Sequence, residues 1–363
     1  MSDAQTFADM MTDGHPLVEG QVVLDLDGLK IALKSNSHAL LEQLGVYFAH
    51  ALGAGPADID VLAIERDVMD LGVSFVDWAR EPGKTGRKDA YFDLEGERLV
   101  QKVRTGMVFL QSQTHRIAAG PCLEFDNQVI NFVNAQYMNW LQQNGQLICH
   151  ASGLVMDGRC LAMAGLSGGG KSTLMLNMMD EGDVHYLTND RLFLSRDGAR
   201  VKATGIPKLP RINPGTIVHN PVLKPILPEE RIAELSALPK DELWELEEKY
   251  DVDVEDLYGE GKITPVADLA AFVVLHWDRG SDAPCLIKPA DLAERPDLLG
   301  AIMKSPGPFY QFKDGSFFQD DMPLDSAPYL DILADTPVFE ATGGIDFDAA
   351  AQFCLDHMKA KAA

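Results

Sequence analysis

The sequence predicts an α/β protein in two parts: a smaller α+β N-terminal domain over residues 1–145 and a larger core with a glycine-rich loop over 146–363. Three observations predict this. The chain has 363 residues, more than the ~100 to 200 of a usual domain. In its first part, some segments alternate apolar and polar residues as strands do, and others repeat apolar residues at helical spacing. From residue 146, two apolar strand patterns run directly into the glycines and then a helix.

Composition and charge exclude several classes of protein. Hydrophobic residues make up 46% of the chain, and apolar runs such as 267–277 are shorter than the ~20 residues that span a bilayer. The first residues lack the basic and apolar regions of a secretory signal, so we expect a cytoplasmic protein. A net charge of −24 disfavours nucleic acid and anionic membranes as partners. A nucleotide remains compatible, because phosphate loops use backbone N–H groups and one lysine.

The cysteines predict neither a disulfide framework nor a thiolate zinc site. There are five of them, widely scattered and without a CxxC pair. We expect buried thiols with a structural role.

Elements of the first part follow from turns and periodicity. Residues 22–35 alternate around an Asp-Gly turn and predict a hairpin, as do residues 89–112 around a Glu-Gly turn. Residues 37–52 predict a helix capped by Ser37, and 127–145 an amphipathic helix ending at a glycine. No catalytic signature is recognised in this part. We therefore expect a helper or oligomerisation role, with a homo-oligomer as one outcome.

Elements of the second part are predicted in the same way. Residues 146–165 form a pair of apolar strands, 171–181 a helix and 184–195 a further apolar strand. Proline-rich residues 207–230 predict an ordered loop, and 229–260 an acidic, mostly helical stretch with a solvated face. A buried strand at 270–277 and a terminal helix at 345–358 complete the predicted core.

The glycine-rich loop GLSGGGKS has the spacing of a phosphate-binding (Walker A) loop. Glycines allow successive backbone N–H groups to converge on phosphate oxygens, and the following helix start adds partial positive charge. Lys171 is expected to reach the β and γ phosphates, and the Ser172 hydroxyl to coordinate Mg²⁺. The residues predicted to bind ATP are Gly165, Leu166, Ser167, Gly168, Gly169, Gly170, Lys171, Ser172 and Thr173.

The tetrapeptide LSGG within this loop also matches the signature of transporter ATPases. Such an ATPase carries its LSGG well downstream of a separate Walker A loop. Here Leu166–Gly169 lie inside the Walker A pattern itself, and the sequence contains no second one. The transporter interpretation is therefore rejected.

A second acidic element should follow a neighbouring strand and hold Mg²⁺ directly or through water. Asp190 follows the apolar pattern HYLTN and is the best candidate. Together with Ser172 it forms the predicted metal site.

These residues resemble the catalytic domain of HPr kinase/phosphorylase, a phosphate-loop kinase similar to phosphoenolpyruvate carboxykinase. The resemblance covers about 148–195 and rests on His150, the loop GLSGGGKS and TNDR at 188–191. It is greatest to a divergent group called HprK-related kinase B. It implies a P-loop, HPr kinase/PEP carboxykinase-like C-terminal core. The N-terminal part does not resemble that of HPr kinase, so its hexameric assembly is not carried over.

The sequence departs from the family at the residue regarded there as the catalytic base. Asn189 stands at that position, and a neutral amide cannot accept a proton. Asp190 could then serve both metal and nucleophile, or His150 could act as the base. Arg211 and Gly215 echo only loosely the family's signature for metal binding and phosphorolysis, so we expect weak or absent phosphorylase activity.

Basic residues near this signature are candidates for charge stabilisation. Lys208 and Arg211 could clamp the transferring phosphoryl group or the target, with Lys262 a weaker candidate. The alternative, that all three are solvated loop charges, stays open.

The function predicted from the sequence is an ATP- and Mg²⁺-dependent kinase acting on a hydroxyl, most readily a protein or peptide serine. The predicted catalytic residues are His150, Asn189, Asp190, Lys171 and Arg211. Two alternatives stay open, a non-catalytic ATP sensor or assembly module and a small-molecule kinase.

Overall fold

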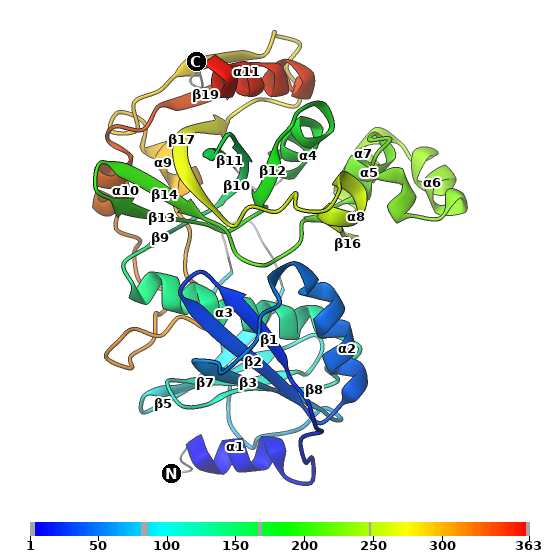
Figure 1. The fold of residues 1–363 in the computed structure, drawn as a ribbon, viewed down its shortest axis with the longest axis vertical. Helices are drawn as coiled ribbons and strands as arrows, with labels where there is room; N and C mark the ends of the chain where they lie inside the picture. Colours follow the sequence, from blue (N-terminus) through cyan, green and yellow to red (C-terminus); the bar gives the residue numbers. More distant parts are fainter. Residues whose placement is uncertain (1–3, 81–85, 166–168, 247, 361–363) are drawn as a thin grey trace. The chain divides into compact units, whose positions relative to one another are not determined.

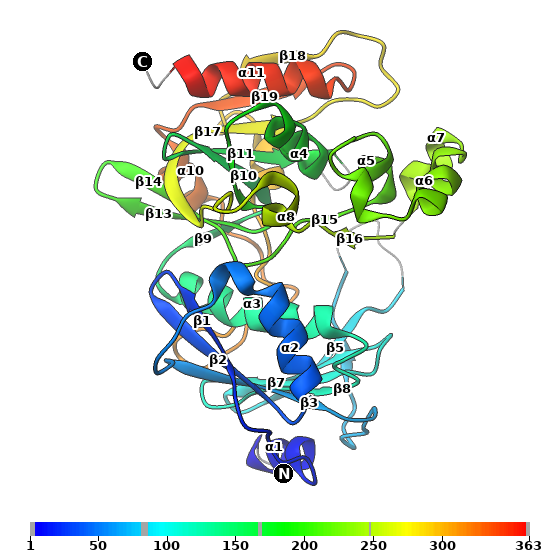
Figure 2. The same cartoon turned by 45° about the vertical axis from the view of Figure 1, so that its right-hand side comes forward.

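The computed structural model describes residues 4–80, 86–165, 169–246 and 248–360. They form a mixed α/β fold with two compact units, one running to residue 145 and including 305–323, the other comprising the rest (Figures 1 and 2). The predicted ATP-binding residues Leu166, Ser167 and Gly168 lie outside the described residues. No helix among those described combines the length and the apolar character needed to cross a bilayer.

The first unit contains a mixed sheet with the strand order β1-β2-β3-β8-β7-β6-β5-β4. Its strands β2, β3 and β8 run parallel to one another, and the other pairs are antiparallel. The strands are β1 Val22–Leu26, β2 Leu29–Ser35, β3 Ile59–Glu65, β4 Val76–Asp77, β5 Asp89–Leu94, β6 Glu97–Lys102, β7 Val108–Ser112 and β8 Arg116–Gly120. The predicted hairpins are confirmed by the β1–β2 and β5–β6 pairings, but the second stretch, 89–112, also contains the third strand β7.

Helices cover both faces of this sheet. They are α1 Ala4–Thr12, α2 His38–Tyr47, the short 3₁₀ helix η1 Ala49–Ala51 and α3 Asp126–Gln143. Figure 1 shows α1 on the opposite face from α2 and α3. The predicted cap of α2 is confirmed, because the Ser37 hydroxyl accepts a hydrogen bond of 3.3 Å from the Leu40 N–H.

Residues 305–323 belong to the first unit, whereas the sequence places them in the second domain. The buried Arg98 side chain explains the difference, because it donates to the Phe318 carbonyl at 2.9 Å and the Pro308 carbonyl at 3.1 Å. Its guanidinium also lies 4.7 Å from the Phe317 ring centre. Nothing in the local sequence of this segment specifies so distant a partner.

The second unit contains a sheet with the path β12-β10-β11-β17-β14-β13-β9, and β19 pairs with both β17 and β18. A separate short pair joins β15 to β16. The strands are β9 Leu147–Cys149, β10 Ala151–Met156, β11 Arg159–Gly165, β12 His185–Thr188, β13 Leu192–Asp197, β14 Arg200–Thr204, β15 Arg211–Ile212, β16 Tyr250–Asp251, β17 Val266–Leu275, β18 Leu286–Pro289 and β19 Val338–Thr342. The pair of strands predicted over 146–165 is confirmed as β10 and β11, but residues 147–149 form a separate strand, β9, which pairs with β13.

The helices of the second unit lie on both faces of its sheet and beside α4. They are α4 Lys171–Glu181, α5 Pro214–Val218, η2 Lys224–Ile226, α6 Glu229–Ser236, α7 Lys240–Glu245, α8 Val254–Tyr258, α9 Pro296–Ile302, α10 Ala327–Leu333 and α11 Phe347–Ala360. One face of the sheet packs its apolar side chains against α4 and α11, and the other against α9 and α10. Figure 2 shows α5 to α8 gathered beside α4. The helices predicted at 171–181 and 345–358 are confirmed.

Two predictions for this unit need correction. The single strand predicted over 184–195 is two strands, because β12 pairs with β10 while β13 pairs with β9 and β14. A turn closed by the Thr188 hydroxyl, which donates to the Arg191 carbonyl at 2.8 Å, separates them. The loop predicted over 207–230 contains β15, α5 and η2.

All five cysteines are free thiols in the structure. One is half-buried and the others are buried.

Candidate functional site

The sheet topology brings three predicted residues to one edge. Strand β10 runs antiparallel to both of its neighbours, with Ala151 opposite Ala164 of β11 and Gly153 opposite Thr188 of β12. The start of β10 therefore lies beside the ends of β11 and β12. This places His150, Gly165 and Asn189 together at the same edge.

The described end of the glycine loop leads into α4 through a glycine with left-handed backbone. Gly170 precedes α4 with φ of 86°, in the left-handed region that glycine adopts without strain. A Cβ atom there would lie 2.7 Å from the ring of Phe347. No side chain caps the start of α4, so its first N–H groups are suited to an anion.

Lys171 begins α4 and turns back over the loop. Its side chain is buried, and its Nζ donates to the Gly165 carbonyl at 3.0 Å, at the start of the loop. Ser172 follows it in the first turn and is half-buried. The Thr173 hydroxyl lies 2.9 Å from that of Thr216 in α5, so this side chain ties two helices together.

His150 and Asp190 meet across the sheet edge. The Nε2 atom of His150 lies 3.0 Å from Oδ1 of Asp190, and the other carboxylate oxygen contacts the Arg191 guanidinium. The backbone N–H of His150 is fixed by the Ile302 carbonyl at 2.7 Å. The His150 side chain is 20% exposed and that of Asp190 49% exposed, so the pair remains accessible to solvent.

Burial and the neighbouring charges shift the pKa values of both residues of this pair. Burial lowers the pKa of His150, the hydrogen bond with Asp190 raises it, and the nearby Lys171 charge lowers it, with a net lowering. Burial raises the pKa of Asp190, but Arg191 and His150 lower it more, and it ends well below its usual range. At neutral pH we therefore assign a neutral imidazole that donates Nε2–H to an ionised carboxylate.

The three predicted basic residues lie in different places. The Lys208 carbonyl accepts a bond of 2.6 Å from the hydroxyl of Tyr186 in β12. Burial and the charges of Arg191 and Arg211, opposed by Asp190, lower the pKa of the Lys208 amino group to about 8. Among the described residues, the partners of Arg211 are Asp251, at 3.1 Å, and the Lys249 carbonyl. Arg211 is thus not brought into direct contact with the other predicted catalytic residues.

Lys262 lies away from the sheet edge described above. Its Nζ is 2.7 Å from Asp183, just before the start of β12, whereas Asn189 follows the end of that strand. The structure therefore separates Lys262 from the candidate site.

Two further residues border the site and carry no signal in the sequence. Lys304 follows Met303, which bridges to Cys149, and its charge lowers the pKa values of both His150 and Asp190. The indole N–H of Trp277 donates to the Gly169 carbonyl at 2.9 Å. Both come from chain segments more than 100 positions from their partners, without a motif of their own.

The oxygen donors at the site suit Mg²⁺, which binds proteins through one or two oxygens and completes its shell with phosphates and water. The Oδ1 atom of Asn189 is a buried acceptor without a hydrogen-bond partner among the described residues. Ser172 and the exposed side of Asp190 supply further oxygens. No group of three His, Cys, Asp or Glu side chains in the described ranges could hold a metal without such phosphates.

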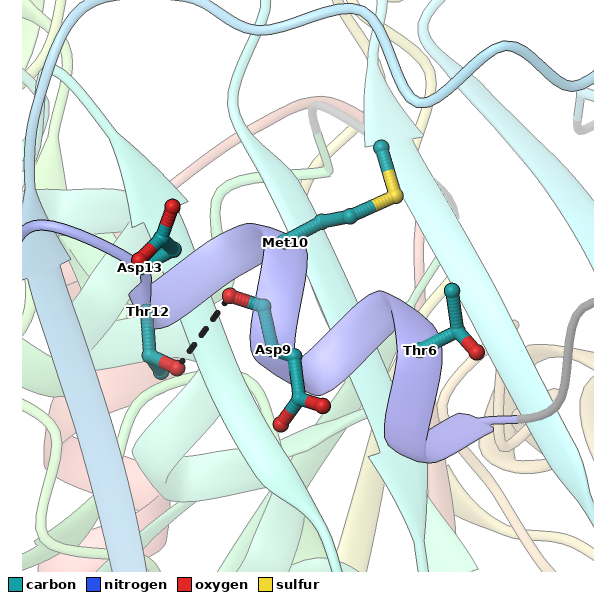
Figure 3. Close-up of a pocket in the computed structure, with 5 residues that line it drawn as sticks. All are labelled: Thr6, Asp9, Met10, Thr12 and Asp13. Carbon is teal, nitrogen blue, oxygen red and sulfur yellow. Dashed lines mark hydrogen bonds between the residues drawn. The ribbon is translucent and has the colours of Figure 1, made fainter.

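A recess on the first unit is not a comparable site. Figure 3 shows its lining, which comes from α1 and the residue that follows it: Thr6, Asp9, Met10, Thr12 and Asp13. The Thr12 hydroxyl is already bound to the helix backbone, at 2.9 Å from the Ala8 carbonyl. All five lining residues come from α1 and the residue after it, so the recess lies on the outer surface of one helix.

No protein-family model matches this sequence, and neither does any curated protein. Among solved structures, the chain is similar to the Hpr(Ser) kinase/phosphatase from Coxiella burnetii, with 12% identity and a TM-score of 0.30. The match covers 60% of this chain and 99% of that chain. At such a low score, the function has to be judged from this chain's own residues.

Proposed function

We propose that this chain is a kinase that uses ATP and Mg²⁺ to phosphorylate a hydroxyl group, on a protein or peptide serine, with little or no phosphorolysis. One observation carries the proposal. The Lys171 amino group lies over the start of the glycine loop, at the sheet edge where His150 meets Asp190. The groups that the proposal assigns to phosphate binding and to proton transfer therefore lie at the same edge, which supports phosphoryl transfer there.

The chain's own groups have distinct roles in this proposal. The first turn of α4 and the Lys171 amino group bind the phosphates and offset the negative charge that develops during transfer. Ser172, Asp190 and the Asn189 carbonyl oxygen would hold Mg²⁺, which supplies charge neutralisation between phosphate oxygens when bound. Asn189 thereby contributes an oxygen without contributing a base.

His150 is the better base of the pair. Efficient proton transfer needs a pKa near the working pH, and the pKa of Asp190 is far below it. When neutral His150 donates Nε2–H to Asp190, its Nδ1 carries a lone pair that can accept the proton of the acceptor hydroxyl. Asp190 then orients the ring as well as binding metal.

The proposal is tested by incubating the pure protein with γ-labelled ATP, Mg²⁺ and an extract of its host. We expect label on one acceptor in the protein fraction, and none when EDTA removes the metal. If the label appeared only on a small metabolite, the acceptor would be a small molecule and not a protein. Hydrolysis or binding of ATP without any labelled acceptor would contradict the kinase proposal.

A second candidate is a non-catalytic ATP sensor. Two observations favour it. Asp190 is already engaged by both His150 and Arg191. The neighbouring Asn189 is an amide at the position where an acid would serve as the base. A sensor would bind ATP with Mg²⁺ and change its association state in size-exclusion chromatography. The labelling experiment separates the two, because only a kinase yields a phosphorylated acceptor.

We assign the Lys208 amino group, whose charge interacts with those of Arg191 and Asp190, to stabilising the transferring phosphoryl group, so its pKa sets an alkaline limit on the proposed activity. Its pKa is lowered to about 8, so it is protonated below that pH and loses its charge as the pH rises through it. We expect the rate of transfer to fall above pH 8 in the wild type. Lys208→Arg should remove this fall, because a guanidinium stays charged.

The matched control is Lys262→Arg, a change at the opposite end of β12. In this variant the rate of transfer should fall above pH 8 as it does in the wild type. An unchanged pH profile in Lys208→Arg would remove Lys208 from the site.

A further inference from the structure

The indole of Trp277 lies against the glycine loop because of strand register. Strands β11 and β17 run parallel and end together, with Gly165 opposite Leu275. Two residues further along, the Trp277 Nε1–H donates to the Gly169 carbonyl at 2.9 Å. Trp277 thus contacts the described end of the loop at Gly169.

The backbone on both sides of Trp277 is held firmly. The His276 N–H donates to the Ala341 carbonyl at 2.9 Å, and the Asp278 N–H donates to the Gly343 carbonyl at 2.8 Å. The side chain of the preceding residue is also held, because His276 Nδ1 is 2.7 Å from the largely buried Glu340 carboxylate. The indole therefore projects from a fixed segment.

A second ring completes the contact with the loop. Phe347, at the start of α11, packs edge-on against Trp277 with ring centres 5.1 Å apart. A Cβ atom added to Gly170 would lie 2.7 Å from Phe347 and 3.4 Å from Trp277. Both rings thus touch Gly170, which explains why this position excludes a side chain.

The hydrogen bond to Gly169 has a consequence for phosphate binding. The peptide that joins Gly169 to Gly170 is planar and trans, so its C=O and N–H point in opposite directions. Because the carbonyl faces the indole, the Gly170 N–H faces away from it. A fixed N–H at this point of a phosphate loop needs no reorganisation when a phosphate binds.

We propose that Trp277 is a positioning residue of the nucleotide site, which orients the Gly169–Gly170 peptide so that the Gly170 N–H binds a phosphate of ATP. This inference rests on the proposed function. It assigns to Trp277 an effect on ATP affinity rather than on the transfer step, because the indole acts through the loop.

The test compares Trp277→Phe, which keeps a ring and removes the N–H, with Trp140→Phe in the first unit. Isothermal titration with Mg²⁺-ATP should show about tenfold weaker binding by Trp277→Phe and unchanged binding by Trp140→Phe. The KM for ATP should rise while kcat changes less than twofold. An affinity of Trp277→Phe equal to that of the wild type would overturn the inference.

Tryptophan emission gives a second measurement on the wild type. The chain has four tryptophans, and ATP should change the emission of the wild type and of Trp78→Phe, Trp140→Phe and Trp244→Phe. Only Trp277→Phe should lose the change. ATP binding with no change in wild-type emission, or a change that persists without Trp277, overturns the inference alone. A wild type that binds no ATP overturns the proposed function as well.

Discussion

Replacing Lys171 by alanine is expected to lower phosphoryl transfer from ATP about a thousand-fold, because it removes a cation fixed at the point where charge develops. The amino group is buried and held by the Gly165 carbonyl, so no solvent-exposed side chain is expected to replace it. Transfer from γ-labelled ATP, measured in a single turnover, checks the rate. Calorimetric titration checks ATP binding separately.

The matched control for this variant is Lys202→Ala, a lysine in the same unit. Lys202 lies on the β13–β14 hairpin, where it pairs with Asp197 and is 43% exposed, so its loss should change neither folding nor transfer appreciably. Near-normal transfer by Lys171→Ala would remove the glycine loop from the reaction. Loss of transfer in both variants would point to damage of the fold instead.

Local elements were predictable because their signals lie within them. Helix α2 is specified by the Ser37 cap and the helical spacing of apolar residues after it. Helix α4 is specified by the glycine loop and the apolar residues that follow it. Hairpin β1–β2 follows from alternation around an Asp-Gly turn, and β10–β11 from two apolar stretches around another Asp-Gly turn. In each case the residues that determine the structure are neighbours in the chain.

Elements that depend on distant partners were not predictable from the same signals. The apolar pattern over 184–195 continues through both β12 and β13, but the two strands pair with different neighbours. The segment 305–323 joins the first unit through two carbonyls that accept from Arg98, 210 and 220 positions away in the sequence. Neither pairing leaves a periodic trace in the segment concerned.

The candidate site divides in the same way. His150 and Asp190 were selected from the sequence by motif and spacing, and the antiparallel course of β10 explains how they meet. The Arg191 contact, which lowers the pKa of Asp190, follows from the geometry of the turn after β12. Trp277 is brought to Gly169 by the pairing of β17 with β11, so only the structure identifies it.

Replacing Asp190 by asparagine is expected to lower transfer about a hundred-fold, because it removes one metal oxygen and the carboxylate that orients His150. The hydrogen bond with Asp190 raises the pKa of His150, so its loss should lower that pKa further. Since the neutral ring is the base, the acidic limb of the pH–rate profile should move to lower pH. More Mg²⁺ should be needed for half-maximal rate. Rates measured from pH 5 to 9 and over a range of Mg²⁺ concentrations check both effects.

The control for this variant is Asp268→Asn, which removes a carboxylate paired with Arg200 at the far end of β17 and should leave transfer, metal requirement and pH profile unchanged. The two shifts in Asp190→Asn separate its roles. A raised Mg²⁺ requirement with an unmoved acidic limb would leave Asp190 as a metal ligand and exclude His150 as the base. A moved limb with an unchanged Mg²⁺ requirement would leave Asp190 as the partner of His150 alone. An unaltered rate would contradict both roles, and with them the assignment of chemistry to this edge of the sheet.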